Sequence, residues 1–354
     1  MKTSIKIAIL VLLIAISVSA FASFSGHYLC VRRNGATYKH RLYTTTAEVG
    51  SPRMATRVGG TTYYAKMFSG ELAGLFLKAK HSGVSYQILE HMLKKTATYG
   101  NGAGTGSGQF SLACCIAFDS SGNFYVTDLS LDRVQKFDSS GSYVTKWGST
   151  GTGNGYFNEP RGIAVDSDGY VYVVDGLNDR LQVFTSSGSF VRVIGSSGST
   201  DGKFQNPFGI AIQGSNLVVQ DSDGRIQWFT KTGSFVKKNT PSTSGTLAIC
   251  VEPTTNNLYV TNGTRVIKCD PNGYYATSWA CTAPYGVAAD GMGNVFVVSY
   301  ASSGDLLQYS DSGVSKASHK WLYSPSSLSY PYGLALGIDG NIYATAQTYI
   351  NKFE

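Results

Sequence analysis

Few residues of this chain could perform acid–base or metal chemistry. After residue 95 the only histidine is His319, and the only glutamates are Glu159, Glu252 and Glu354. Catalytic triads and catalytic zinc centres need several such side chains that converge on one point. No Ser–His–Asp set can be assembled with these residues, and no Cys-x-x-Cys pair occurs. The composition therefore favours a non-catalytic protein and predicts neither a metal nor a cofactor.

Acidic residues recur in two patterns. Asp-Ser-Asp-Gly at 166–169 and 221–224 matches part of a calcium loop but lacks the downstream bidentate glutamate, so we interpret both runs as hairpin turns. Three aspartates are each followed by an arginine, namely Asp128 and Arg133, Asp175 and Arg180, and Asp221 and Arg225. A pair that is repeated in this way indicates structural ion pairs rather than a catalytic pair.

The spacing of the aspartates belongs to a longer repeat. Phe110, Phe157 and Phe204 each follow a Gly-rich loop and lie 47 residues apart. A fixed period of this size indicates an array of one supersecondary unit. In the second copy, four short runs rich in β-branched and aromatic residues lie between 160 and 195, separated by Gly, Ser or Asp. Four antiparallel strands per repeat are typical of a propeller blade.

Six copies of the first strand can be counted, which begin near Cys115, Gly162, Gly209, Ala248, Gly286 and Gly333. The sixth copy has only three strands before the chain ends at Glu354. Residues 96–100 resemble the outer strand of the other copies, so we expect this N-terminal strand to complete the last blade and close the ring. The sequence thus predicts an all-β, six-bladed β-propeller over residues 96–354.

The pattern resembles the NHL repeat family of six-bladed propellers. The resemblance lies in Phe-x-x-Pro-x-Gly-Ile-Ala-Val-Asp at 157–166, Tyr-Val-Val-Asp at 172–175, and the run Arg180-x-Gln182-x-Phe184. It is strongest in the first three blades. The resemblance implies the fold, but not one function, because members of the family include enzymes, RNA-binding proteins and protein-binding modules. Some related propellers are zinc or calcium enzymes of the lyase or lactonase kind.

One set of residues suggests a binding site. The residue before each first-strand glycine or its equivalent should lie at one mouth of the central channel, and these residues are Cys114, Arg161, Phe208, Leu247, Tyr285 and Tyr332. We expect Arg161, Phe208, Tyr285 and Tyr332 to form an aromatic rim with one cation. Such a rim suits an apolar or extended ligand that has one anionic group. The alternative is that these side chains only seal the channel.

The N-terminal part differs from the repeats. Residues 1–22 have two lysines, an apolar run and an Ala-Phe-Ala site, which predict a signal peptide or a signal anchor. Residues 23–95 form a basic segment that we expect to be partly helical, over 70–80 and 85–95, or disordered. Residues 1–95 carry 13 Lys and Arg against 3 acids, and the remainder carries 16 against 19. The basic segment suggests contact with an anionic surface or a plain linker, and the propeller's balance argues against nucleic-acid binding.

The six cysteines leave their pairing open. Full oxidation would allow 15 pairings, whereas Cys250 and Cys269 should be too far apart to bond if two strands separate them. The sequence as a whole predicts an extracellular or cell-surface binding module for a protein, peptide or glycan. A metal-dependent lyase or lactonase is the alternative, and a purely structural unit of a surface layer is a third hypothesis.

Overall fold

The computed structural model describes two units, residues 1–93 and 94–354. In the second unit it describes residues 95–241, 245, 247–300, 305–319 and 331–353, with the backbone alone for 316–319. In the first unit it describes the backbone of seven strands between residues 28 and 87. All structural statements below concern these residues.

The second unit consists of six four-stranded antiparallel sheets. Blade 1 contains β9 (Ala113–Phe118), β10 (Phe124–Asp128), β11 (Arg133–Phe137) and β12 (Tyr143–Trp147). Blade 2 contains β13 (Pro160–Val165), β14 (Val171–Asp175), the short 3-10 helix η2 (Gly176–Asn178), β15 (Arg180–Phe184) and β16 (Phe190–Ile194). Blade 3 contains β17 (Ile210–Gln213), β18 (Asn216–Gln220), β19 (Ile226–Thr230) and β20 (Phe235–Asn239).

The last three blades follow the same order. Blade 4 contains β21 (Ala248–Val251), β22 (Leu258–Thr261), β23 (Arg265–Cys269) and β24 (Tyr275–Ala280). Blade 5 contains β25 (Pro284–Ala289), β26 (Asn294–Ser299), β27 (Leu306–Ser310) and β28 (Ser315–His319). Blade 6 contains β29 (Pro331–Leu336), β30 (Ile342–Ala346) and β31 (Tyr349–Phe353), and its outer strand is β8 (Lys95–Tyr99).

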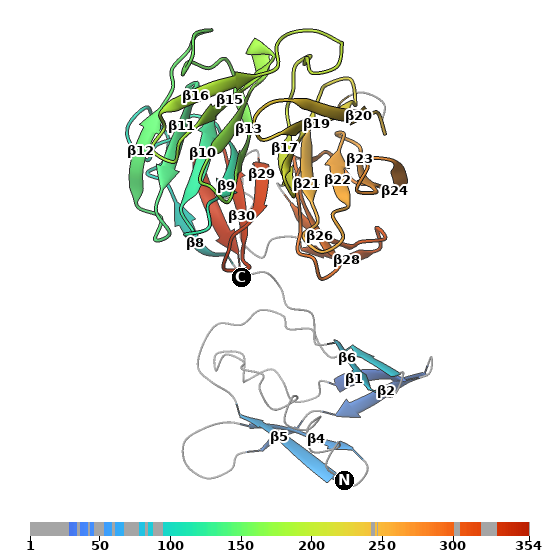
Figure 1. Ribbon diagram of the computed structural model, residues 1–354. Helices are drawn as coiled ribbons and strands as arrows, with labels where there is room; N and C mark the ends of the chain where they lie inside the picture. Colours follow the sequence, from blue (N-terminus) through green and yellow to red (C-terminus); the bar gives the residue numbers. More distant parts are fainter. Residues whose placement is uncertain are drawn as a thin grey trace. The chain divides into compact units, whose positions relative to one another are not determined.

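The six sheets stand around one axis with the first strand of each blade innermost (Figure 1). Inner strands of successive blades contact one another, and β29 of the last blade contacts β9 of the first. β8 pairs antiparallel with β31, so one blade combines strands from both ends of the propeller segment. The predicted six-bladed all-β propeller is therefore confirmed.

Apolar residues of the middle strands fill the space between blades. All five residues of β10 and of β14 are buried, whereas the outer strands β12 and β16 alternate between partly buried and exposed positions up to Ile194, the buried last residue of β16. The repeated phenylalanines Phe110, Phe157 and Phe204 are fully buried within these cores. This explains the 47-residue spacing, because each phenylalanine fills the equivalent core position one blade further along the chain.

The Asp and Arg pairs hold the Gly-rich loops that precede blades 1, 2 and 3. In blade 2, Asp175 accepts from Arg180 Nε at 2.8 Å and from the backbone N–H of Asn158 at 2.8 Å. Arg180 also donates to the carbonyls of Gly153 and Tyr156 in the loop. Asp128 with Arg133, and Asp221 with Arg225, form the corresponding contacts in blades 1 and 3. These ion pairs are structural, as predicted.

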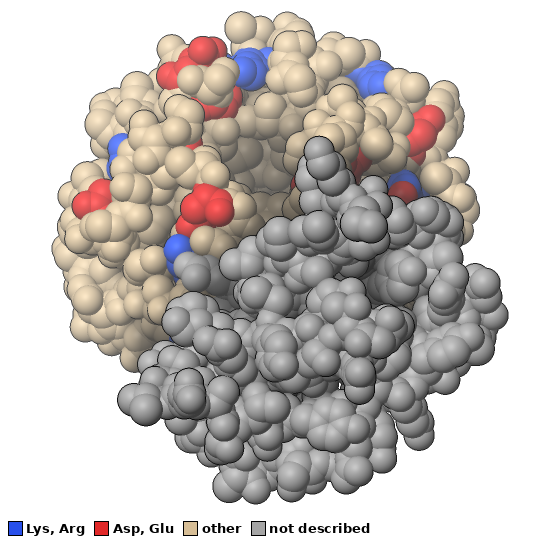
Figure 2. Space-filling model, turned by 90° about the horizontal axis from the view of Figure 1, so that it is seen from below, with Lys and Arg blue, Asp and Glu red and all other residues tan. Residues whose placement is uncertain are grey.

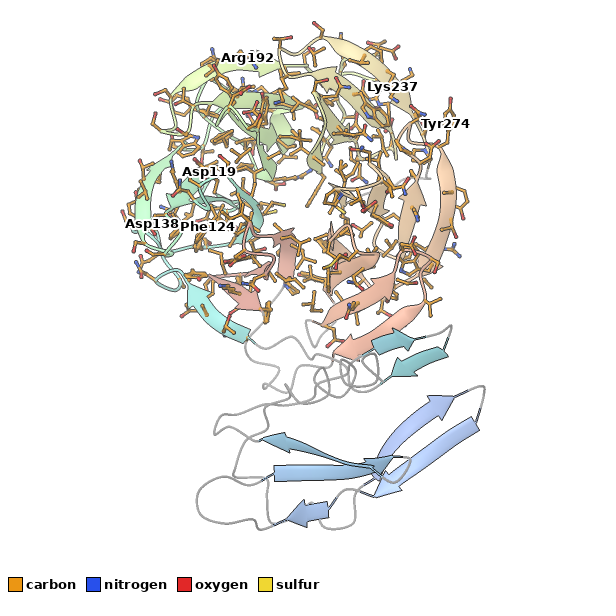
Figure 3. All side chains as sticks on the ribbon, turned by 60° about the horizontal axis from the view of Figure 1, so that its bottom comes forward. Asp119, Phe124, Asp138, Arg192, Lys237 and Tyr274 are labelled. Atoms are coloured by element: carbon orange, nitrogen blue, oxygen red, sulfur yellow. The ribbon has the colours of Figure 1, made fainter. Side chains whose placement is uncertain are left out.

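The Asp-Ser-Asp-Gly runs are hairpin turns. Asp166 accepts hydrogen bonds from the N–H of Asp168 and Tyr170 and from the hydroxyl of Tyr172, at 2.9 to 3.0 Å. Asp119 occupies the equivalent turn of blade 1, and Asp138 makes the same kind of contacts in the turn between β11 and β12 (Figure 3). In blade 3 the N–H of Gly224 donates to the carbonyl of Asp221, and residues 221–224 form the turn between β18 and β19. Both runs are therefore hairpin turns, as interpreted from the sequence.

In the part of the first unit that the structure describes there are three small antiparallel sheets, and strands overlap both segments expected to be helical. The sheets are formed by β1 (Tyr28–Arg33) with β2 (Ala36–Arg41), by β3 (Tyr43–Thr45) with β4 (Arg53–Val58) and β5 (Thr61–Lys66), and by β6 (Lys78–His81) with β7 (Val84–Gln87). β6 and β7 cover parts of the segments predicted as helices, at 70–80 and 85–95. The last residue of the second segment begins β8, and the other residues of both segments lie outside the described residues. The alternating polar and apolar residues of these short runs fit paired strands better than helices.

Residues 1–22, for which a signal peptide or anchor is predicted, lie outside the described residues. Among the residues that the structure describes, none belongs to a helix with the length and apolar character of a membrane span. The five cysteines whose side chains the structure describes, Cys114, Cys115, Cys250, Cys269 and Cys281, are all free thiols. Cys250 and Cys269 lie on the first and third strands of blade 4, so the separation expected from the sequence is present.

Candidate functional site

The six predicted rim positions lie at the start of the inner strands or just before them, at one end of the channel. In blades 1, 2, 5 and 6 a β-bulge sets the rim residue and the residue after it opposite a single residue of the second strand. In blade 6, for example, Tyr332 and Gly333 lie opposite Thr345. The bulge breaks the usual alternation of the strand and therefore directs the rim side chains toward the mouth.

Threonines of the second strands join neighbouring blades at this level. Thr345 Oγ1 accepts from Gly333 N of its own blade and donates to the Cys114 carbonyl of blade 1, both at 2.7 Å. Thr127 and Thr261 donate in the same way to the carbonyls of Arg161 and Tyr285. The carbonyl of each of these rim residues is thus fixed by the preceding blade, and so is the position of the side chain that it bears.

The positions after the rim are small because the inner strands approach closely. A Cβ on Gly333 would lie 2.4 Å from the carbonyl oxygen of Cys114, and one on Gly286 would lie 2.7 Å from Leu334 N. Only in blades 1 and 4 does another residue stand there, namely Cys115 and Ala248. The glycine of the repeat therefore serves the packing of adjacent inner strands.

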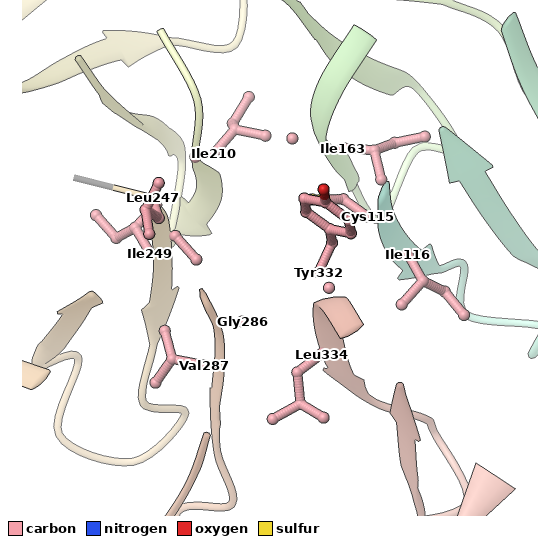
Figure 4. Close-up of a pocket in the computed structure, with 14 residues that line it drawn as sticks. Cys115, Ile116, Ile163, Ile210, Leu247, Ile249, Gly286, Val287, Tyr332 and Leu334 are labelled. Atoms are coloured by element: carbon pink, nitrogen blue, oxygen red, sulfur yellow. The ribbon is translucent and has the colours of Figure 1, made fainter. Parts of the chain in front are cut away.

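One residue further along each inner strand, aliphatic side chains close the channel. They are Ile116, Ile163, Ile210, Ile249, Val287 and Leu334, and all six are buried. Figure 4 shows them around the axis, with the ring of Tyr332 projecting into the same space. The cavity that remains has a volume of about 60 Å³, which is room for a few water molecules and far below the volume of a typical ligand pocket. A ligand at this end would therefore sit on the rim rather than inside the channel.

Tyrosines from blades 5 and 6 form one cluster on the rim. The ring centroids of Tyr285 and Tyr332 lie 5.2 Å apart, nearly perpendicular. Tyr300, which follows β26, lies 5.0 Å from Tyr285 and 5.5 Å from Tyr332. All three side chains are partly exposed. Burial and a hydrogen bond with Tyr300 raise the pKa of Tyr332, so its hydroxyl is protonated at neutral pH. The cluster presents aromatic surface together with hydroxyl groups.

Arg161 and Phe208 form a separate part of the rim. The guanidinium of Arg161 lies 5.1 Å from the ring centroid of Phe208 and donates to Glu159 at 2.7 Å and to Asn206 at 2.6 Å. Only 8% of Arg161 is exposed. Its charge is already matched by Glu159, and its side chain is less exposed than those of the three tyrosines. Cys114, also predicted at the rim, is fully buried.

Tyr300 is the rim residue that the sequence analysis missed. It lies directly after the second strand of blade 5, and its N–H donates to the carbonyl of Ala283, just before the rim position of the same blade. Because the second strand is antiparallel to the first, its end meets the start of the first strand at the same face. That rule applied to Tyr300 could have added it to the predicted site.

No group of three or more His, Cys, Asp or Glu side chains in the described part of the chain is arranged to hold a metal ion. Figure 2 shows the other end of the ring, at which β31 ends; acidic and basic residues occur there in small scattered groups, and this face is hollowed near the centre of the ring. At the rim, the six described positions are mainly aromatic and aliphatic, and the ion pair of Arg161 with Glu159 is their charged part.

The NHL repeat matches residues 157–184 of blade 2. The chain contains an NHL repeat. This NHL match covers most of the motif residues on which the predicted resemblance was based, and the six-bladed arrangement agrees with it. No curated protein matches the chain.

Solved structures share the architecture at low sequence identity. A catalytically inactive variant of virginiamycin B lyase from Staphylococcus aureus with quinupristin is 13% identical over 91% of this chain and 98% of its own, with a TM-score of 0.53. A protein of unknown function from Bacteroides thetaiotaomicron is 18% identical over 92% and 90%, with a TM-score of 0.54. A streptogramin B lyase is 13% identical over 94% and 99%, with a TM-score of 0.50. At these identities the likeness shows the fold alone.

Proposed function

We propose that this NHL-type propeller is a non-catalytic binding module that holds a protein, peptide or glycan ligand on the rim of its channel. The observation that supports the proposal most is the cluster of Tyr285, Tyr300 and Tyr332. Partly exposed tyrosines offer a rigid aromatic surface and a polar hydroxyl at small entropic cost, which is why they are frequent in binding sites. The closed channel beneath them would keep the ligand on this surface.

The experiment is a comparison of rim variants in one binding screen. Tyr285→Ala and Tyr332→Ala should weaken the binding of a glycan or peptide selected on arrays, while Tm falls only slightly. Tyr274→Ala is the matched control, because Tyr274 is 65% exposed on the outer side of blade 4 (Figure 3). Loss of stability in the rim variants without loss of binding would support a sealing role and remove this site from consideration.

Arg161→Ala serves a different purpose. If the ligand has an anionic group, this variant should weaken its binding, and the loss should shrink at high salt. Because Arg161 pairs with Glu159 within the rim, we expect a smaller effect on binding than that of either tyrosine variant. An equal loss for neutral and anionic ligands would mean that Arg161 acts only by positioning the rim.

A metal-dependent lyase or lactonase is the second candidate function. It is supported by the fold shared with virginiamycin B lyase, and opposed by the scarcity of His and Glu after residue 95. Metal analysis of the purified protein separates the two proposals. A stoichiometric bound zinc or calcium ion would overturn the non-catalytic proposal.

We also propose an extracellular or cell-surface location, with the basic segment 23–95 between the propeller and the N-terminal apolar residues. The support is the signal-like sequence of residues 1–22. Protease treatment of intact cells of the native host should cleave the propeller. Complete protection from the protease would count against this location. No nucleic-acid partner is proposed.

A further inference from the structure

Cys114 and Cys115 place two thiols side by side at the channel mouth. Their sulfur atoms lie 3.7 Å apart. Side chains of neighbouring strand residues normally point to opposite faces of the sheet. Here β9 has a β-bulge between the residues that pair with Val126 and Asp128 of β10. The bulge interrupts the alternation and brings both sulfurs together. The three other described cysteines have no sulfur contact of this kind.

The two thiols differ in access. Cys114 is fully buried, whereas Cys115 is partly exposed and lines the channel cavity. The hydrogen bond with Cys115 and burial raise the pKa of Cys114 well above its usual range. Cys115 is therefore the sulfur that a reagent from the channel reaches first, and Cys114 is the buried thiol in contact with it.

We propose that Cys114 and Cys115 form an oxidation site at which hydrogen peroxide produces a disulfide between adjacent residues. The sulfur of Cys115 attacks one peroxide oxygen and loses its proton, the O–O bond breaks, and a sulfenic acid forms with release of water. The sulfur of Cys114 then attacks the sulfur of Cys115, loses its proton, and displaces a second water. Two thiols and one peroxide thus yield one disulfide and two waters, with two electrons transferred to the oxidant.

The cavity selects the size of the oxidant. A space of about 60 Å³ holds a few water molecules and therefore admits hydrogen peroxide. A tripeptide disulfide such as oxidised glutathione is much too large for it. The site therefore favours peroxide over exchange with glutathione.

The disulfide would alter the junction between the last and the first blade. The Cys114 carbonyl accepts from Thr345 of blade 6, and the N–H of Cys115 donates to Thr127 at 3.0 Å. Adjacent Cα atoms are about 3.8 Å apart across a trans peptide, less than the usual separation across a disulfide, so closure requires a local backbone change. We expect a strained and easily reduced bond, of the labile type, and a lower Tm in the oxidised protein.

The test is peroxide treatment of the reduced full chain, followed by trypsin digestion and mass spectrometry. Cleavage after Lys95 and Arg133 leaves both cysteines in one peptide. The mass of that peptide should fall by that of two hydrogens, its cysteines should resist alkylation, and dithiothreitol should reverse both changes. Its oxidation should be about tenfold faster than that of Cys269 or Cys281. Addition of oxygen without loss of two hydrogens, or equal oxidation of Cys269 and Cys281, would overturn the proposal.

Two variants complete the test. Cys114→Ser should leave Cys115 as a sulfenic acid, which dimedone traps once the protein is unfolded in its presence. Cys115→Gly introduces the residue that four other blades have at this position, so it should fold, and its Tm should no longer respond to peroxide. A peroxide-dependent fall in Tm that persists in Cys115→Gly would show that another residue is responsible and would refute the assigned effect on the blade junction.

Discussion

Replacing Thr345 by valine tests how the ring is closed. Thr345 Oγ1 donates to the Cys114 carbonyl and accepts from Gly333 N, and Thr345, Cys114 and Gly333 are all buried. Valine keeps the β-branched shape but removes the hydroxyl, so one buried N–H and one buried carbonyl lose a partner. At about 1–3 kcal/mol for each of the two groups, we expect the free energy of unfolding to fall by about 2–6 kcal/mol. At about 2–4 °C per kcal/mol for a domain of this size, the corresponding fall in Tm is roughly 4–24 °C.

Urea unfolding followed by tryptophan fluorescence measures this change, with Tm from circular dichroism as a second readout. Thr345→Ser, which keeps the hydroxyl, is the matched control and should recover most of the loss. Thr261→Val removes the equivalent contact between blades 4 and 5 and should cost about as much, since blades interact with their nearest neighbours.

A loss below about 0.5 kcal/mol in Thr345→Val, which is usual for a surface substitution, would refute this reasoning. It would mean that the Cys114 carbonyl finds another partner. Blade 2 shows how that can happen: Val174 stands at the threonine position there, and Gly162 N donates directly to the carbonyl of Phe208 at 2.9 Å.

Three further predictions concern the rest of the ring. Deletion of residues 96–100 should expose the edge of β31 and lower Tm of the whole propeller; an unchanged Tm would contradict closure by this strand. Gly286→Ala should cost at least about 1–3 kcal/mol in urea unfolding, because its Cβ would lie 2.8 Å from the Tyr332 carbonyl oxygen, and wild-type stability would show that the strands can separate. Burial alone would raise the pKa of Asp339, but hydrogen bonds from groups that include Asn341 and Lys352 lower it to about 2. Since the unfolded value is about 3.9, its contribution to stability is present above that pH and is lost as pH falls toward 2; Asp339→Asn should flatten this part of the pH–stability curve, and an unaltered curve would exclude the effect.

The sequence determined the architecture because each blade repeats the same short-range rules. Phe110, Phe157 and Phe204 recur at one interval, and the strands between them have β-branched and aromatic residues bounded by Gly and Asp. Such a repeat fixes the fold even where single strands are ambiguous, since six copies must pack in the same way. The sequence also identified the rim positions, because equivalent residues of a ring lie at one level.

Only the tertiary structure decided what the rim residues contact. Arg161 pairs with Glu159 and stacks on Phe208, while Tyr300 joins Tyr285 and Tyr332 from a different strand. The sulfur contact of Cys114 and Cys115 likewise depends on a bulge in β9. Outside the repeats, periodicity over 70–80 predicted a helix, whereas the described residues at the end of this segment belong to β6. Repeats restrict backbone geometry through many equivalent contacts, whereas side-chain pairing and single short strands depend on neighbours that are distant in the sequence.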